Sequence, residues 1–269
     1  MSEQAGPEQA GSKVIIANWK MFPKPPNSAG KVDELTRGLA QEIPQVPSDR
    51  EIIICPPALF LERVARALQG TGMKIGTQNL YQEPFGAFTG ETSADMFRSV
   101  GCTHAIIAHS ERRTMGETNQ TAKAKVQAAL DAGLSPILCV GEQLEERSDG
   151  RANEVVGRQI MDTIGTLPKE QVRKVIIAYE PRWAIGSGKI PSLDDIGGMH
   201  GYIRGLLEEW FQRSVADDVK KPYGGSVKPG NAAEILGIKD VDGVLVGGES
   251  LIAPNFAQIV NAGRKKVLA

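Results

Sequence analysis

The sequence predicts a closed (β/α)8 barrel of the α/β class, formed by a single domain. Short β-branched runs alternate with amphipathic segments eight times along the 269 residues, which indicates βαβ units and a parallel sheet. The length and a hydrophobic content of 41% suffice for one large core, and barrels of eight such units have about 250 residues. The alternative is a doubly wound open sheet, which usually has a Gly-rich turn after its first strand. Here the first strand ends in Asn18-Trp19-Lys20.

The expected strands are short and rich in β-branched residues. In chain order they cover 13–17, 51–55, 73–77, 104–108, 135–140, 174–179, 219–223 and 241–246, of which the seventh is the weakest. Amphipathic segments between them predict helices. These helices cover 29–43, 59–68, 94–100, 119–132, 151–164, 193–212, 230–236 and 255–262. No linker-like tract interrupts the pattern after residue 12, so we expect a disordered tail at 1–12 and one barrel domain at 13–269.

The composition argues against several classes of function. A net charge of -1 gives no sign of nucleic acid or an anionic membrane as a general partner. Cys55, Cys102 and Cys139 are odd in number and form no CxxC pair, which argues against a disulfide framework or a structural zinc site. Reduced thiols fit a cytoplasmic protein. The N-terminus lacks the features of a signal peptide, and no apolar run approaches the length of about 18 residues that a transmembrane helix needs.

Polar side chains follow several of the expected strands. Asn18 and Lys20 follow the first, His109 the fourth and Glu180 the sixth. Because the carboxyl ends of the strands share one face of a parallel barrel, which carries the active site, these groups are expected to converge. Glu180 closes an apolar run and precedes a segment, 181–189, with a proline at its start and two glycines near its end. That layout is typical of a general base beside a loop that closes over it.

Glycine pairs follow the seventh and eighth strands. Glycine lets the backbone approach an anion closely, and phosphate sites in such barrels commonly lie after the last two strands. The sequence therefore predicts a phosphate site formed by Gly225, Ser226, Gly247 and Gly248, with Gly186 contributed by the closed loop. Tight turns without a ligand are the alternative for either pair alone.

Each candidate group also has an ordinary explanation when taken alone. Lys20 fits a surface lysine, His109 a structural histidine and Glu180 an ion-pair partner. His104 begins a strand and His200 lies in a helix, so neither is given a functional role. Only the combination of an amine, an imidazole, a carboxylate and two Gly-rich turns at one face favours catalysis.

Taken together, these residues and the segments around them resemble the triosephosphate isomerase family. The resemblance covers residues 13 to about 262, nearly the whole chain. Its motifs occur in the right order and are highly specific. They are Ala-Asn-Trp-Lys-Met at 17–21, Gln-Asn at 78–79, Gly-Ala-Phe-Thr-Gly-Glu at 86–91, His-Ser-Glu-Arg-Arg at 109–113, Cys-Val-Gly-Glu at 139–142, the Glu180 segment, Tyr-Gly-Gly-Ser-Val at 223–227 and the run 242–248.

The resemblance implies a TIM barrel that interconverts dihydroxyacetone phosphate and glyceraldehyde 3-phosphate. In this family a glutamate, here Glu180, removes a carbon-bound proton to give an enediolate, and a neutral histidine, here His109, polarises the carbonyl. The resemblance further implies that Lys20 supplies positive charge and Asn18 a hydrogen bond.

Further features implied by the resemblance concern the supporting residues, the cofactor and the partner. Ser110 and Glu111 would support the site, and Glu111 would hold the Lys20 region in place. No metal or organic cofactor is implied, because the proton leaves and returns on side chains. A homodimer is implied, in which the loop 82–93 carries Thr89 to the partner's Asn18 and the partner's Glu111. An apolar loop tip gives this dimer only weak support from the residues themselves.

Several positions depart from the family pattern. Arg182 replaces a valine in the lid hinge, Phe22 replaces an asparagine and is followed by three prolines, and Ala108 replaces a glycine. Glu249 places a carboxylate after the phosphate-binding glycines, where we expect it to point to solvent or to a base such as Lys228. None of these changes removes a catalytic group. They leave open a paralogue acting on a tetrulose phosphate, and a barrel that binds a phosphorylated ligand without catalysis.

Overall fold

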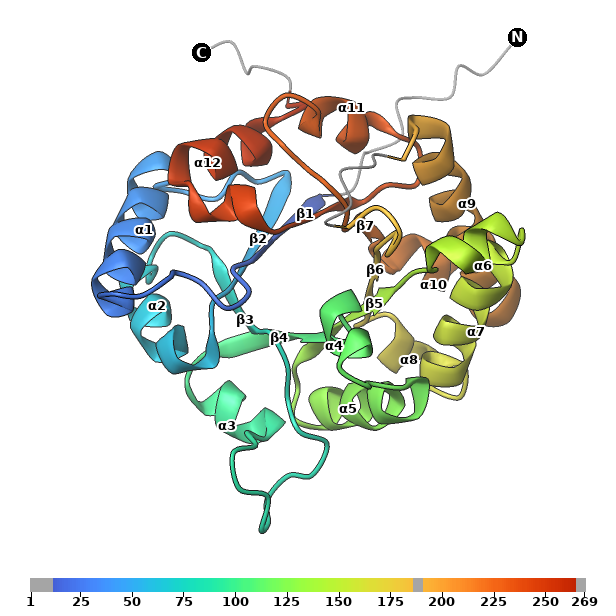
Figure 1. The fold of residues 1–269 in the computed structure, drawn as a ribbon, viewed down its shortest axis with the longest axis horizontal. Coiled ribbons are helices and arrows are strands. Elements are labelled where there is room, and N and C mark those ends of the chain that lie inside the picture. Colours follow the sequence, from blue (N-terminus) through green and yellow to red (C-terminus); the bar gives the residue numbers. More distant parts are fainter. Residues whose placement is uncertain (1–11, 186–190, 265–269) are drawn as a thin grey trace, which may run out of the picture.

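The computed structural model describes residues 12–185 and 191–264, and its eight strands form the closed parallel barrel that the sequence predicts. The strands pair in chain order, and β1 closes the barrel by pairing with β8 (Figure 1). They are β1 (Lys13–Asn18), β2 (Arg50–Cys55), β3 (Lys74–Thr77), β4 (Cys102–Ile107), β5 (Ser135–Val140), β6 (Ile176–Tyr179), β7 (Pro222–Tyr223) and β8 (Gly243–Val246).

Helices form a ring around the barrel (Figure 1). They are α1 (Ser28–Glu42), α2 (Leu61–Ala67), α3 (Ala94–Ser99), α4 (Ser110–Thr114), α5 (Asn119–Asp131), α6 (Leu144–Ser148), α7 (Ala152–Ile164), α8 (Lys169–Val172), α9 (Leu193–Phe211), α10 (Arg213–Asp218), α11 (Ala232–Gly237) and α12 (Ala253–Asn261). Two short 3-10 helices, η1 (Ala58–Phe60) and η2 (Gly248–Leu251), precede α2 and α12. The short helices α4, α6, α8 and α10 are not among the elements predicted from the sequence.

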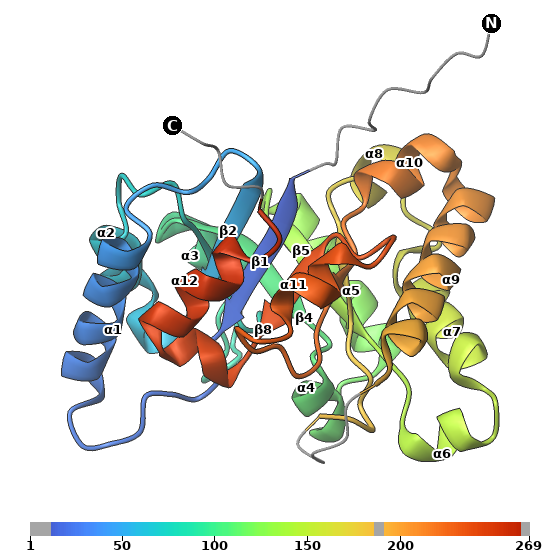
Figure 2. The same cartoon turned by 90° about the horizontal axis from the view of Figure 1, so that it is seen from above.

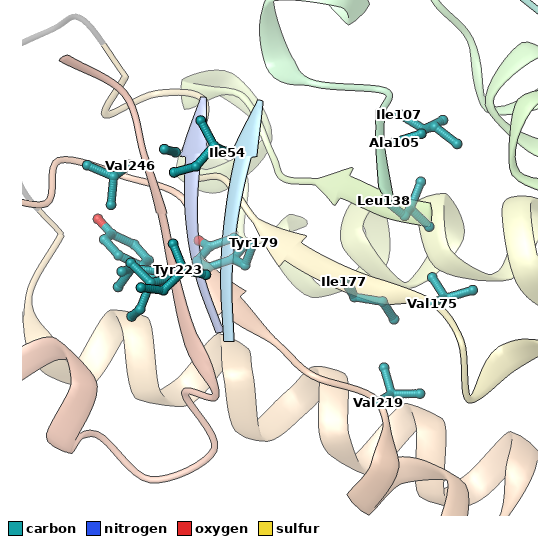
Figure 3. Close-up of a cluster of buried hydrophobic side chains, with 14 of the residues drawn as sticks. Ile54, Ala105, Ile107, Leu138, Val175, Ile177, Tyr179, Val219, Tyr223 and Val246 are labelled. Carbon is teal, nitrogen blue, oxygen red and sulfur yellow. The ribbon is translucent and has the colours of Figure 1, made fainter. Parts of the chain in front are cut away.

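Side chains along the strands alternate between two apolar clusters, because successive residues of a strand point to opposite faces. One cluster fills the barrel interior and includes Val14, Ile16 and Ile53. The other lies between barrel and helices and includes Ile15, Ile52 and the residues labelled in Figure 3. In that view Ile107, Leu138 and Ile177 come from the neighbouring strands β4, β5 and β6.

The seventh strand is shorter than the expected 219–223. The Lys221 N–H donates to the Asp242 side chain (3.0 Å), and its buried ammonium lies 2.7 Å from the same carboxylate. Pro222 has no N–H to offer. Two residues therefore remain to pair as a strand with β6 and β8.

The strands β1 to β8 run in one direction, and their carboxyl ends carry α4 and α6 (Figure 2). This is the face on which the sequence places the candidate site. The loop between β3 and α3 projects from the rim of the ring (Figure 1). Of the expected tail 1–12, only Ser12 is described, and it accepts hydrogen bonds from the Lys220 ammonium at 2.8 and 2.9 Å. Within the described ranges, no helix has the length and apolar character needed to cross a membrane.

Candidate active site

The candidate residues Asn18, Lys20, His109 and Glu180 line one cavity at the carboxyl ends of the strands, with a volume of about 300 Å³. The turns after β7 and β8 complete its lining. They contribute Gly224, Gly225, Ser226, Gly247, Gly248 and Glu249. The structure therefore brings together the groups that the sequence predicted to converge. The lid segment is described over 181–185, and Gly186 with the remainder up to residue 189 lies outside the described residues.

Glu180 is fixed by the backbone at the end of β6. Its N–H donates to Val140 of the neighbouring strand at 2.7 Å, and its side chain is only 2% exposed. One carboxylate oxygen, Oε1, lies 2.8 Å from His109 Nε2. The other, Oε2, accepts the N–H of Ser110 at 2.8 Å. A carboxylate buried in this way is held in one position and shielded from water.

His109 forms the N-cap of α4. Its Nδ1 accepts the backbone N–H of Glu111 at 3.2 Å, so the ring carries its proton on Nε2 and donates it to Glu180. The preceding residue, Ala108, adopts a left-handed φ of 58°, where a Cβ costs about 1 kcal/mol. Its N–H donates to the Glu117 carboxylate at 3.0 Å, which helps to hold that conformation.

The two buried groups shift each other's pKa. Burial alone would raise the pKa of Glu180, but the His109 ring and the Ser110 N–H hold it below its usual range. Burial alone would lower the pKa of His109, but the adjacent Glu180 carboxylate holds it above its ordinary value. The pKa of His109 is therefore raised mainly by the Glu180 carboxylate, with a smaller contribution from Glu111.

Lys20 lies at the rim of the cavity. Its backbone has a φ of 51°, and its N–H donates to Asn18 Oδ1 at 3.0 Å. Its ammonium lies 2.5 Å from Glu111 Oε1. A Cβ added at Gly247 would lie 3.4 Å from Lys20 Cε, so the lysine passes over the eighth turn. Gln78 Nε2 donates to the Lys20 carbonyl at 2.9 Å and fixes the loop.

The two Gly-rich turns differ in what their glycines do. A Cβ at Gly224 would lie 2.8 Å from Glu180 Cγ, so this glycine leaves room for the carboxylate side chain. No atom lies within 4 Å of a Cβ built at Gly248, which leaves that backbone open to a ligand. Glu249 accepts a hydrogen bond from Asn255 Nδ2 at 2.7 Å. The expected partner Lys228 is therefore not the group that holds it.

One functional residue has no role in the sequence analysis. Glu142, which is fully buried, accepts hydrogen bonds from Trp183 Nε1 at 2.8 Å, Tyr179 Oη at 3.1 Å and Arg147 at 3.3 Å. It thereby anchors the start of the lid segment. Its position two residues after β5 is a strand-end signal similar to that of Glu180, but its neighbours along the chain gave no reason to pair it with Trp183.

Two further expectations concern groups away from the cavity. Thr89 is exposed on the projecting loop and does not line the site of its own chain. Over residues 12–185 and 191–264, no group of three or more His, Cys, Asp or Glu side chains is placed to hold a metal ion.

Comparison with known proteins identifies the family. The triosephosphate isomerase family model matches residues 13–263. The triosephosphate isomerase of Clostridium perfringens is 44% identical over 251 residues, covering 92% of this chain and 98% of that protein. The enzyme of the same name from Rhodopirellula baltica is 43% identical over 250 residues, covering 93% and 96%. A crystal structure of triosephosphate isomerase from Bartonella henselae has a TM-score of 0.83 and 37% identity, covering 94% and 99%. The chain therefore belongs to the triosephosphate isomerase family, whose members are isomerases.

Proposed function

We propose that this chain interconverts dihydroxyacetone phosphate and D-glyceraldehyde 3-phosphate. The observation that carries the proposal is the hydrogen-bonded pair of Glu180 and His109 in a cavity that Lys20 and two Gly-rich turns also line. The relatives at 43–44% identity carry the name of the triose enzyme, which supports a triose over a tetrulose phosphate.

Glu180 acts as the base in this proposal. It leaves its hydrogen bonds to His109 and Ser110, takes a proton from the carbon beside the substrate carbonyl and returns it to the neighbouring carbon. Burial favours this role, since a carboxylate without water around it is a stronger base. A second proton leaves the hydroxyl oxygen of the substrate and reaches the former carbonyl oxygen, and His109 shuttles it between the two oxygens. Both protons therefore stay on the substrate and the side chains, and the product is the isomer of the substrate.

His109 acts as the donor to the substrate carbonyl. When Glu180 turns toward the substrate, the group that raises the pKa of His109 is withdrawn. Burial and the N-terminus of α4 then both favour the neutral ring. Its Nε2–H is free to hydrogen-bond the oxygen that gains negative charge in the enediolate.

Lys20 and the glycine turns bind the charged end of the substrate. The Lys20 ammonium supplies the positive charge, and Asn18 donates its amide N–H to the substrate. The phosphate lies on the backbone of Ser226, Gly247 and Gly248, with Gly186 added from the lid. Phosphate is common to triose and tetrulose phosphates. The phosphate site therefore selects a phosphorylated sugar and does not set the number of its carbon atoms.

The lid segment 181–189 closes over the bound substrate. Its described start is held by Glu142 through Trp183, and Arg182 N–H donates to the Glu142 carbonyl at 3.1 Å. Closure excludes water from the enediolate and limits the loss of phosphate.

A homodimer in the cytoplasm is part of the proposal, with the barrel domain at 13–269 and the segment 1–12 outside it. Phe85 and Phe88 on the projecting loop are 83% and 40% exposed, which favours their burial by a second copy. Thr89 between this tip and the barrel would then reach the partner's Asn18 and the partner's Glu111.

Steady-state turnover of glyceraldehyde 3-phosphate, with a tetrulose phosphate measured alongside, tests the function. We expect kcat/KM for the triose near the diffusion limit of about 10⁸–10⁹ M⁻¹s⁻¹. Glu180→Asp, which retracts the base by one methylene, should lower kcat by roughly 100-fold or more with little change in KM. Higher turnover of the tetrulose, or unchanged kcat in Glu180→Asp, would refute the substrate or the base respectively.

A further inference from the structure

A second cavity lies beside the candidate site and shares none of its lining residues. Its volume is about 810 Å³, within the range of roughly 300–1,000 Å³ found for small-molecule sites. Its walls are the loop that follows β1, one face of α1, and the segment from the end of η2 to the start of α12. The loop wall contains Phe22 and the first of the three prolines that depart from the family pattern.

One part of this cavity is apolar. Phe22, Leu35 and Leu251 are half-buried around it, and Pro254 adds a further apolar surface. At its floor α1 approaches α12 closely, because Gly38 has no side chain: a Cβ there would lie 3.0 Å from that of Ala253. An apolar body of the size of an aromatic ring fits this part, since its burial would remove apolar surface from water.

The other part carries an excess of positive charge. Lys24, Lys31 and Arg37 line it together with a single carboxylate, Glu34. The side chains of Arg37 and Glu34 are exposed and form no hydrogen bond or salt bridge with any described residue, and Arg37 adds to the positive field that lowers the pKa of Asp33. Lys31 donates to the Lys24 carbonyl at 2.8 Å, which holds the loop against α1. Three cations against one anion complement a negatively charged ligand.

We propose that this cavity binds a small organic anion with an apolar body, an aromatic or branched carboxylic acid in chemical class. The apolar body lies against Phe22 and Leu251, and the acid group meets Arg37 and Lys31. This site is separate from the isomerase site and does not depend on the proposed reaction for its binding.

Binding in this cavity is linked to the phosphate end of the candidate active site. Phe22 lies two residues after Lys20, and Leu251 ends the 3-10 helix that begins at Gly248. Ser250 ties that helix to the eighth turn, since its N–H and Oγ both donate to the Gly247 carbonyl, at 2.9 and 2.6 Å. A ligand that fixes these two walls therefore changes the affinity for phosphate. This coupling rests on the proposed phosphate site.

Amide chemical shifts of the full-length protein test the binding, with three probes that separate its two requirements. We expect 3-phenylpropionate to shift the signals of Gly38 and Leu251 to saturation. Propionate lacks the apolar body and 3-phenylpropan-1-ol lacks the charge, so each should bind at least about tenfold more weakly. Equal binding of either control, or shifts confined to other parts of the barrel, would overturn the site.

Charge variants on exposed positions of α1 give a test with opposite signs. Arg37→Gln should weaken 3-phenylpropionate binding and Glu34→Gln should strengthen it, each by roughly threefold to tenfold. Lys123→Gln removes an exposed cation of α5 and should change nothing. A general disturbance of the helix would shift both α1 variants in one direction, and that result would refute the charge assignment.

The coupling has its own measurement, the dissociation constant of inorganic phosphate with and without saturating 3-phenylpropionate. We expect a change of at least about fivefold, and by linkage phosphate must change the affinity for the probe by the same factor. An unchanged constant refutes the coupling. If the wild-type protein does not turn over the triose, the isomerase function is refuted. Both binding measurements remain valid in that case.

Discussion

His109 Nε2 lies 2.8 Å from Glu180 Oε1, and both side chains are at least nine-tenths buried. This single contact joins the ends of β4 and β6 and sets the protonation of both groups. It also sets a cost for catalysis in the proposed mechanism, because Glu180 must break it before it reaches a substrate carbon. The replacement hydrogen bond from His109 to the substrate oxygen compensates for this loss.

Removal of the Glu180 charge should lower the pKa of His109. In Glu180→Gln the attraction that holds this pKa above its ordinary value is lost, while burial continues to lower it. NMR titration of the imidazole resonances measures the change directly. His104 and His200 serve as internal controls, because burial lowers the pKa of each to about 4 and neither should titrate between about pH 5.5 and 8. A His109 pKa that rises or stays constant would contradict the assigned cause.

Gly224→Ala should reduce kcat and leave the fold intact. The added methyl would lie 2.8 Å from Glu180 Cγ and 3.3 Å from the Tyr179 carbonyl oxygen, so the carboxylate has to move, whereas the φ of Gly224 is one that alanine can adopt. A displacement of about 1 Å at a catalytic group costs roughly 100-fold in rate. Gly205→Ala, at an exposed position of α9, is the control, since its Cβ meets no atom within 4 Å and the residue does not line the cavity. Equal kcat values for the two variants would mean that Gly224 does not position the base.

The sequence predicted those features that depend on periodicity and strand ends. Asn18 ends β1, His109 lies two residues after β4 and Glu180 directly follows β6, and parallel pairing alone brings such positions to one face. The sequence analysis missed contacts between side chains far apart along the chain. Glu142 holds Trp183, 41 residues away, and no pattern of neighbouring residues encodes that distance.

The ends of several helices and strands also differ from those predicted from the sequence. The expected helix 193–212 ends at Phe211, because Gln212 adopts a left-handed φ of 83°, and α10 follows. The seventh strand is short because Asp242, 21 residues later, takes the Lys221 N–H. Glu249 likewise contacts Asn255 and not Lys228. At the seventh strand, a contact between residues far apart along the chain overrides local propensity.

Lys20→Ala should raise KM strongly, by about tenfold or more, because a charge-assisted contact to phosphate is removed. Glu111→Gln is the companion variant, since it keeps the ammonium and removes the ion pair at 2.5 Å, together with the weaker attraction of Glu111 for His109. The two side chains are 27% and 48% exposed, so solvent screens this pair and its loss should change KM by less than about fivefold. Steady-state kinetics on the triose separate the two effects. A KM in Lys20→Ala equal to that of the wild type would remove Lys20 from the phosphate site.

Acid should destabilise the barrel partly through its buried histidines, and His200 allows a clean test. Burial lowers the pKa of folded His200 to about 4, from 6.5 in the unfolded chain. Below pH 6.5 the unfolded chain thus binds a proton that the folded chain does not, and stability falls until the pH reaches about 4. This one group accounts for about 3 kcal/mol over that window.

His200→Phe keeps a ring beside Tyr179, whose centroid lies 5.7 Å from that of His200, and removes the titration. The variant loses the contact between Nδ1 and the Ile196 carbonyl at 2.9 Å, so at pH 7 it should be less stable by about 1 kcal/mol. Its stability should then fall less steeply with acid than that of the wild type. Denaturant unfolding at pH 7 and pH 4.5 measures how the free energy of unfolding changes with pH in each protein. The carboxylates contribute equally to this change in the wild type and in the variant. Parallel slopes would show that His200 is protonated in the folded barrel as readily as in the unfolded chain.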